Sequence, residues 1–174
     1  HAPTLVNHRV TRREWAVRTQ CRSEEQHAYG DRHEGVMSDP VLWQFKYSHY
    51  NEKARWALDF KRIPHVRRSL LPGAHMPRVL WMTGQKAVPV LVLDGKAIAD
   101  STRIIDALER WRPDPPLHPS DPSQRARATA LEEFFDEELG PHVRRTWFYE
   151  LMPDADFTVA QIAVGCSATT QRMY

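Results

Sequence analysis

A strand, a tight turn, a second strand and a helix follow one another between residues 90 and 112, and this run restricts the fold most. Val90–Leu93 and Lys96–Ala99 are short, largely apolar segments separated by Asp94-Gly95. An Asp-Gly pair favours a two-residue hairpin turn, because both turn positions need positive φ and these residues tolerate it best. An amphipathic helix follows and ends at Pro113. The run predicts a sheet covered by helices.

The preceding residues predict a β-α-β unit. The segment 41–46 alternates and places Val41, Trp43 and Phe45 on one face of a strand. Residues 52–62 read as a helix, which Ser48 or Asn51 would cap, with a core-facing stripe. The stripe consists of Ala54, Ala57, Leu58 and Lys61. A strand at 65–70 and a short helix at 76–83 complete an α/β layered domain.

The sequence pattern changes after residue 112, from alternating strands and helices to a proline-rich segment followed by helix. Prolines make 113–120 an extended linker, and Asp121-Pro122 begins a helix that Gly140-Pro141 should kink or interrupt. The pattern fades after Pro153. A long amphipathic helix cannot bury its stripe alone, so we expect 121–174 to be an incomplete all-α domain. If nothing covers them, five of its aromatic residues would lie exposed: Phe134, Phe135, Trp147, Phe148 and Tyr149.

Residues 1–37 lack a sustained period of 2 or 3.6, and we expect a disordered extension there, with the folded part beginning near Met37. A transit peptide is the alternative, but five acidic residues disfavour it. The 24 Lys and Arg against 22 Asp and Glu give a net charge of +2. This balance favours neither nucleic acid nor an anionic membrane as a partner.

The two cysteines, Cys21 and Cys166, lie far apart and form no Cys-x-x-Cys pair. A disulfide framework, a zinc ribbon and a dithiol redox site therefore lack their residues, and we expect no metal. A reducing compartment, the cytoplasm, is the expected location.

Three sets of residues could carry chemistry: Ser48 before the first helix, Val88-Pro89 before the hairpin, and Asp100-Ser101 at the last helix. Each has a purely structural explanation when taken alone. Serine and aspartate commonly cap helices, and proline is tolerated at the first residue of a strand.

In order and spacing, these residues resemble the amino-terminal domain of the cytosolic glutathione transferases, nearest to the bacterial-type serine or cysteine branch. The likeness rests on the runs 47–59, 87–91 and 98–105 together with Asp94-Gly95. It covers roughly residues 40–112 and extends more weakly through 121–151. The resemblance implies a thioredoxin-like βαβ-ββα domain over 38–112 that binds glutathione.

The resemblance also implies roles for single residues. Ser48 would direct its hydroxyl at the glutathione sulfur, and Val88 would offer its backbone to the cysteinyl part through a cis bond to Pro89. Asp100 and Ser101 would hold the γ-glutamyl end. For the glycine carboxylate the candidates are Lys86, His75 and Arg78.

The chemistry of these residue types agrees with those roles. A carboxylate beside a hydroxyl and free helix N–H groups can bind both charges of a γ-glutamyl group. Lowering a thiol pKa from about 8.5 by two units takes about 2.7 kcal/mol. A hydroxyl hydrogen bond to a charged group supplies about 1.5–3 kcal/mol, and a helix N-terminus about 0.3–1 kcal/mol more.

Some departures leave alternatives open. The family often has proline after the catalytic residue, where this chain has His49, and Tyr47, His49 or Tyr50 could replace Ser48. Arg55 and Trp56 are interpreted as structural residues.

Two functions follow from these observations. The first is an enzyme that activates glutathione for transfer to a small electrophile. For this enzyme we also expect a homodimer. The alternative is a non-catalytic glutathione-transferase-like module or an inactive fragment. Retention on immobilised glutathione, measured alongside activity toward an aryl halide, separates the two.

Overall fold

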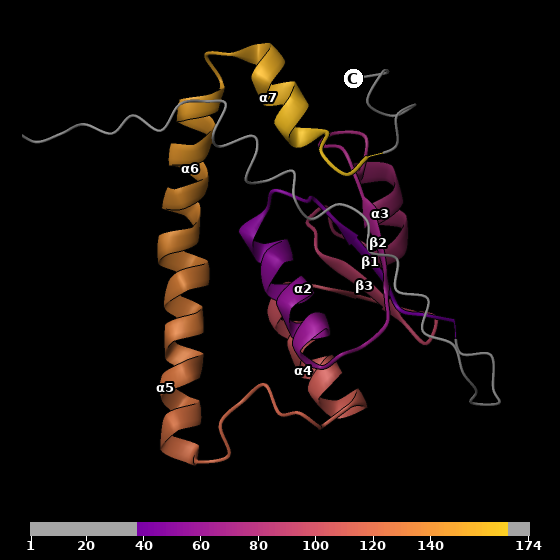
Figure 1. Ribbon diagram of the computed structural model, residues 1–174, viewed down its shortest axis with the longest axis vertical. Coiled ribbons are helices and arrows are strands. Elements are labelled where there is room, and N and C mark those ends of the chain that lie inside the picture. The colour runs from indigo at the N-terminus through magenta and orange to yellow at the C-terminus, as the bar shows by residue number, and fades with distance from the viewer. Residues whose placement is uncertain (1–37, 167–174) are drawn as a thin grey trace, which may run out of the picture. The chain divides into compact units, whose positions relative to one another are not determined.

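The computed structural model describes residues 38–166, all within one compact unit (Figure 1). The expectations for residues 1–37, Cys21 among them, lie outside the described residues. The strands are β1 (Val41–Gln44), β2 (Val66–Ser69), β3 (Val90–Leu93) and β4 (Lys96–Ala99). The helices are α2 (His49–Phe60), α3 (Met76–Thr83), α4 (Ser101–Trp111), α5 (Pro122–Glu133), the π-helical η1 (Phe134–Leu139), α6 (Gly140–Leu151) and α7 (Ala155–Ile162).

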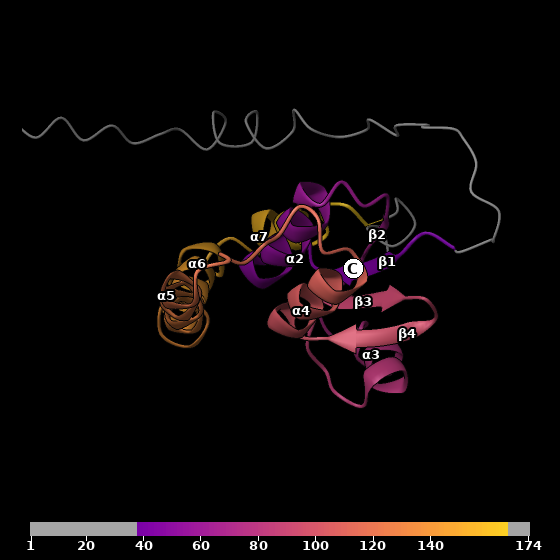
Figure 2. The same cartoon turned by 90° about the horizontal axis from the view of Figure 1, so that it is seen from below.

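The four strands form one mixed sheet in the order β2-β1-β3-β4. β1 pairs in parallel with β2 and antiparallel with β3, and β3 pairs antiparallel with β4. Helices α2 and α4 pack on each other on one face, while α3 covers the other face (Figures 1 and 2). This is the α/β layered domain that the order of elements predicts, in the thioredoxin-like arrangement that the resemblance implies.

The predicted hairpin is confirmed. Leu93 pairs with Lys96, and the turn residues have positive φ, 50° at Asp94 and 76° at Gly95. Such a turn is specified by its own two residues, since few others tolerate both conformations. The hairpin sets where α4 begins, directly after β4.

The core lies between the sheet and the α2–α4 pair. Its fully buried members come from all three elements: Leu42, Leu91, Ala54, Leu58, Ile104 and Leu108. The predicted stripe of α2 is confirmed, including the buried Lys61. Helix α2 begins three residues earlier than predicted, because Ser48 rather than Asn51 is its N-cap residue.

The alternation predicted for β1 is present, and the face that carries Val41 and Trp43 is the less buried one. Leu42 and Gln44 are buried against the helices, whereas Val41 and Trp43 are only half-buried. β1 is an inner strand with cover on both faces, so its period of two does not reveal which face is the more buried.

The prolines after α4 are held by one buried charge. The Lys61 ammonium pairs with Glu109 at 2.6 Å and donates to the carbonyls of Arg112 at 2.6 Å and Pro115 at 2.9 Å. A buried ammonium requires such partners. Lys61 therefore fixes the path by which the chain leaves the α/β domain.

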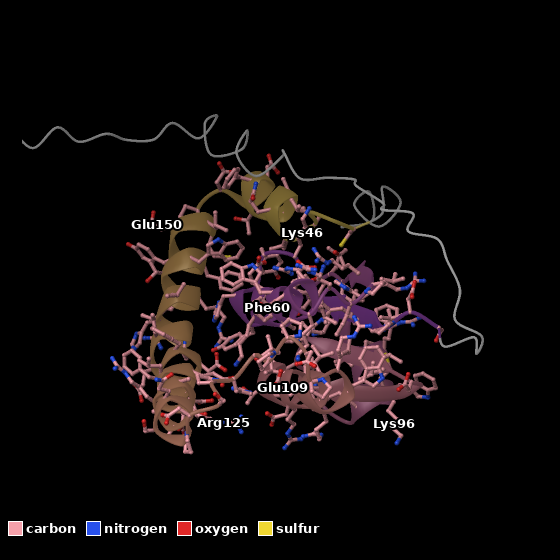
Figure 3. The ribbon with its side chains drawn as sticks, turned by 60° about the horizontal axis from the view of Figure 1, so that its bottom comes forward. Lys46, Phe60, Lys96, Glu109, Arg125 and Glu150 are labelled. Carbon is pink, nitrogen blue, oxygen red and sulfur yellow. The ribbon has the colours of Figure 1, made fainter. Side chains whose placement is uncertain are left out.

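Helices α5, η1 and α6 form one continuous long helix (Figure 1), and Figure 3 shows Arg125 and Glu150 near its opposite ends. Gly140-Pro141 does not end it. The Gly140 N–H instead bonds to the Phe135 carbonyl, five residues back. A π-helical segment adjusts the ladder just before Pro141, which has no N–H to donate.

Of the five aromatic residues expected to be exposed on this helix unless covered, three are exposed and two are partly covered. Phe134, Phe135 and Tyr149 are exposed by 52%, 50% and 77%. Trp147 and Phe148 are half-buried, because they point toward the α/β domain and line a pocket.

Helix α7 was not expected, because the apolar pattern fades after Pro153. Asp154 caps it by accepting from the Phe157 N–H at 3.0 Å, and Thr158 donates to the Leu151 carbonyl. Among residues 38–166, no helix has the length and apolar character needed to cross a membrane.

Candidate functional site

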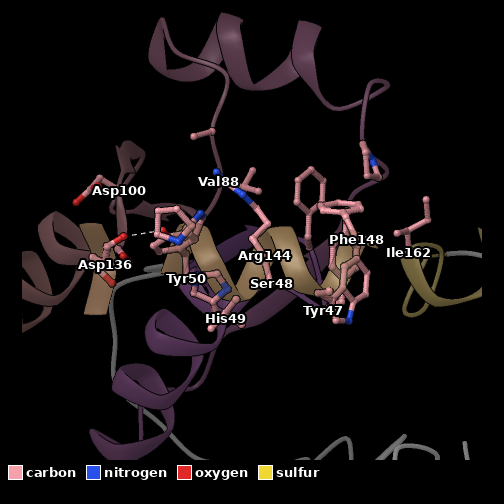
Figure 4. A pocket seen from close by; sticks show the side chains of 18 of the residues that line it. Tyr47, Ser48, His49, Tyr50, Val88, Asp100, Asp136, Arg144, Phe148 and Ile162 are labelled. Atoms are coloured by element: carbon pink, nitrogen blue, oxygen red, sulfur yellow. Dashed lines mark hydrogen bonds between the residues drawn. The ribbon is translucent and has the colours of Figure 1, made fainter. Parts of the chain in front are cut away.

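A single open pocket of about 1010 Å³ collects the main candidate residues (Figure 4). Ser48, Val88, Pro89, Asp100 and Ser101 all line it. The long helix and α7 supply the opposite wall. Residues separated by more than 50 positions in the sequence therefore share one groove.

Ser48 is the N-cap residue of α2, with extended backbone angles φ −84° and ψ 129°. Its side chain makes no cap hydrogen bond. Arg55 secures the loop before it, donating to the Gln44 side chain at 2.6 Å and to the Lys46 carbonyl at 3.0 Å. The hydroxyl is thus positioned at a helix N-terminus without being used by the helix.

The predicted cis bond between Val88 and Pro89 is confirmed. Two contacts hold the segment before it. The Gln85 side chain donates to the Ala87 carbonyl at 2.8 Å, and the His75 Nε2 lies 3.0 Å from the Lys86 carbonyl. Val88 itself lies at the pocket wall.

Asp100 is the N-cap residue of α4, and its backbone has φ 81°. Its Oδ1 accepts from the backbone N–H groups of Thr102 at 3.0 Å and Arg103 at 3.1 Å. A positive φ is uncommon for a residue other than glycine and marks local backbone strain. Asp100 itself is exposed at the pocket, with Ser101 buried beside it.

The comparisons with known proteins agree with this geometry. Residues 42–116 match the family model for the glutathione S-transferase N-terminal domain. Residues 42–116 therefore form a domain of the glutathione S-transferase family. The probable glutathione S-transferase MSR-1 of Nicotiana plumbaginifolia is 31% identical over 109 residues, covering 62% of this chain and 50% of the relative.

Two further matches are similar in extent. A probable maleylacetoacetate isomerase of Caenorhabditis elegans is 34% identical over 94 residues, covering 53% of this chain and 44% of the relative. The Tau class glutathione S-transferase MiGSTU from mango, Mangifera indica, is 27% identical with a TM-score of 0.58, covering 63% and 50% of the two chains. The chain spans about half the length of the curated relatives it matches.

The other hydroxyl and imidazole groups near Ser48 have surroundings of their own. The Tyr50 hydroxyl donates to the Asp136 carbonyl at 2.7 Å, and burial raises the pKa of Tyr50. Tyr47 stacks on Trp147 with ring centroids 5.0 Å apart. Burial, followed by the charge of Arg144, lowers the pKa of His49, so its imidazole is neutral near pH 7.

A cluster of charged and polar side chains joins helices α2 and α4 to the long helix. Lys53 of α2 pairs with Asp136 and Glu132 at 2.6 Å each and donates to the Thr102 hydroxyl of α4 at 3.0 Å. Burial lowers the pKa of Lys53, but the hydrogen bonds to both carboxylates outweigh it and the net pKa is raised. We call these four residues the Lys53 cluster.

Gly140 lies where the long helix meets the start of α2. A Cβ atom on it would lie 2.6 Å from the Tyr50 hydroxyl and 2.9 Å from the His49 Nε2. The sequence suggests a kink at Gly140-Pro141, but this glycine permits close approach. A glycine followed by proline within an otherwise helical stripe is the signal that could have indicated it.

The three candidates for the glycine carboxylate do not line the pocket. The His75 imidazole contacts the backbone of Lys86, and Arg78 lies over the Trp43 ring, 4.6 Å from its centroid. Lys86 is exposed beside Ala87, which does line the pocket.

The two residues interpreted as structural differ from each other. Arg55 is buried and makes the loop contacts given above, which confirms the interpretation. Trp56 is 68% exposed, so the interpretation is wrong for it. No group of three or more His, Cys, Asp or Glu side chains within residues 38–166 is placed to hold a metal ion.

Proposed function

We propose that this chain binds glutathione in the pocket and activates its thiol for transfer to a small electrophile. The observation that carries the proposal is the shared pocket of Ser48, Val88 and Asp100, on a domain of the glutathione S-transferase family. The names of the relatives point to the same substrate.

Ser48 would stabilise the thiolate of bound glutathione. Its hydroxyl is not consumed by helix capping, and it lies at the N-terminus of α2, where the helix dipole favours negative charge. A hydroxyl hydrogen bond to a charged sulfur contributes about 1.5–3 kcal/mol. That is enough to lower a thiol pKa of about 8.5 by one to two units.

Val88 and the α4 N-terminus would fix the peptide on either side of the sulfur. The Val88 N–H and carbonyl would pair with the cysteinyl backbone. Asp100 would attract the γ-glutamyl ammonium, since only its Oδ1 is used in capping. Ser101 and the helix N–H groups would bind the adjacent carboxylate.

The rim of the pocket near Lys86 would receive the glycine carboxylate. Lys86 is exposed and can extend toward a ligand beside Ala87. His75 would act on Lys86 through the backbone carbonyl that it contacts. In this proposal, His75 positions the loop and Lys86 supplies the charge.

The proposal includes a cytoplasmic location and a homodimer. Glutathione is the thiol of reducing compartments. The long helix carries half-exposed apolar side chains that a second copy could cover, namely Leu131, Phe134, Phe135, Leu139 and Val143. Light scattering at micromolar concentration should give twice the chain mass.

The test combines binding and turnover in the 174-residue chain. Calorimetry should detect glutathione binding, and an aryl halide acceptor should be turned over. Ser48→Ala should lower turnover with little change in glutathione affinity, while Ser120→Ala, a change at an exposed serine outside the pocket, should alter neither. Binding without turnover would favour the non-catalytic module. The absence of both in a folded protein would refute the proposal.

A further inference from the structure

The half of the pocket away from Asp100 has an aromatic wall, to which the segment after β1 and helix α6 contribute. Phe45 stacks on Tyr47 at 5.7 Å, Tyr47 stacks on Trp147 at 5.0 Å, and Trp147 meets Phe148 edge to face at 5.0 Å. The interplanar angle is 4° in both stacked pairs. In Figure 4, Tyr47 and Phe148 lie on the side of Ser48 opposite to Asp100. These rings line the pocket and offer an aromatic surface to a flat ligand.

One cation lies beside this wall. Arg144 projects from α6 into the same pocket, and Figure 4 shows it between Ser48 and Val88. Within residues 38–166, no hydrogen bond or ion pair of its guanidinium is found. Its charge reaches His49 and Tyr50, lowering the pKa of His49 after the effect of burial. An anionic ligand could therefore pair with this guanidinium without displacing a protein partner.

Two of the three acidic residues that line the pocket have partners of their own. Asp136 is paired with Lys53, and Asp100 caps α4. Glu137 precedes Arg144 by seven residues, about 10 Å along a helix. Arg144 therefore keeps its charge for a ligand at the Ser48 end of the aromatic wall.

We propose that Arg144 selects aromatic electrophiles that carry a carboxylate, with the ring on the Tyr47–Trp147–Phe148 wall and the carboxylate on the guanidinium. This inference rests on the proposed function and names the acceptor class of the same site. Arginine suits the role because its planar fork matches a carboxylate in two parallel hydrogen bonds.

The reaction balances without a further reactant. Bound glutathione loses its thiol proton to solvent, and the thiolate sulfur forms a C–S bond with the ring carbon that carries chlorine. The C–Cl bond breaks, and chloride leaves with the electron pair. Arg144 takes no part in these steps and acts only through the distant carboxylate.

Two matched acceptors test the proposal: 4-chloro-3,5-dinitrobenzoate and its uncharged amide. For each, kcat/KM is divided by the rate constant of the reaction with free glutathione, which removes the difference in intrinsic reactivity. The full chain should prefer the benzoate about 5- to 20-fold, between the values for an exposed and a desolvated charge pair. Arg144→Gln should abolish the preference and Arg144→Lys should retain part of it. Arg145→Gln, at the neighbouring exposed residue outside the pocket, should leave it unchanged.

Calorimetry on the two glutathione conjugates gives a readout that needs no turnover. The wild-type chain should bind the benzoate conjugate more tightly by a similar factor, and Arg144→Gln should equalise the two affinities. The proposal is overturned if Arg144→Gln keeps the preference for the benzoate over the amide. It is also overturned if kcat/KM falls equally for both acceptors while glutathione itself binds more weakly. If the wild-type chain does not bind glutathione, the proposed function fails instead.

Discussion

The N-termini of α2 and α4 both lie at the same pocket, but only one of them is capped by a side-chain hydrogen bond. At α4, Asp100 accepts from two backbone N–H groups, at a φ of 81°. At α2, Ser48 occupies the cap position and makes no such bond. Capping by a side chain stabilises a protein by about 0.5–2 kcal/mol, and α2 lacks this contribution. The hydroxyl that could have capped the helix is left for a ligand.

The same cap position can therefore serve two purposes. Asp100 contributes to folding and, in our proposal, to binding, because a carboxylate has two oxygens. Ser48 has one hydroxyl and would contribute to chemistry alone. Substitutions at the two positions should therefore separate stability from activity.

The largest effect is expected from Ser48→Ala. Loss of one hydrogen bond to the thiolate should lower kcat about 10- to 100-fold. The free energy of unfolding should change by less than about 0.5 kcal/mol, because no cap bond is lost. Steady-state kinetics and urea denaturation measure the two quantities. A loss of about 1 kcal/mol in stability would show that Ser48 caps α2 in solution.

Asp100→Ala should affect both quantities. Losing the cap should cost about 1 kcal/mol of stability, and losing the charge should weaken glutathione binding about tenfold. Asp100→Asn is the matched control, since asparagine also caps helices and tolerates positive φ. It should keep the stability and lose only affinity. Equal affinity in Asp100→Asn and the wild type would remove the ammonium contact from the proposal.

Gly140→Ala tests how closely α2 must meet the long helix. The added Cβ would displace the Tyr50 hydroxyl from the Asp136 carbonyl and shift His49 next to Ser48. Turnover should fall about threefold to tenfold, since small misplacements of reacting groups are costly. Combining it with Tyr50→Phe should restore part of the activity, because the clashing oxygen is removed. An unchanged rate in Gly140→Ala would mean that this end of α2 is tolerant.

The smallest effect concerns pH and the Lys53 cluster, which links α2 to α4 through Thr102. Burial raises the pKa of Glu132, but the hydrogen bond from Lys53 outweighs it and the net pKa is lowered. Its contribution to stability is therefore present above the ordinary carboxyl pKa of about 4.3 and is lost as pH falls through the lowered value.

Unfolding free energies measured between pH 3 and pH 7 should reveal this contribution, about 0.5–1 kcal/mol for a partly exposed pair. Lys53→Met should flatten that part of the pH profile. Lys96→Met, at an exposed lysine on β4, is the control and should not. Identical profiles for Lys53→Met and the wild type would contradict the coupling.

The parts of the fold that depend on local chemistry could be predicted from the sequence. The Asp94-Gly95 turn and the α4 cap are specified by a few adjacent residues, and the stripe of α2 by its period. The resemblance brought Ser48, Val88 and Asp100 together because their order along the chain fixes their places around the sheet.

The parts that depend on contacts between distant segments were missed. Nothing in the local pattern shows that Trp147 and Phe148 face a pocket, or that Gly140 is there for close approach. Arg144 was overlooked because one exposed arginine on a helix resembles any other until the opposite wall is known. Trp56 belongs to the run 47–59 on which the resemblance rests. Its exposure could not be predicted, because it depends on whether another segment covers the side chain.

The most direct test is a titration of the thiolate absorbance of bound glutathione near 240 nm in the wild-type chain and in Ser48→Ala. We expect the pKa of the bound thiol to lie one to two units below about 8.5 in the wild type and to return toward that value when the hydroxyl is removed. A bound pKa near 8.5 in the wild type, or an equally low value in Ser48→Ala, would contradict it.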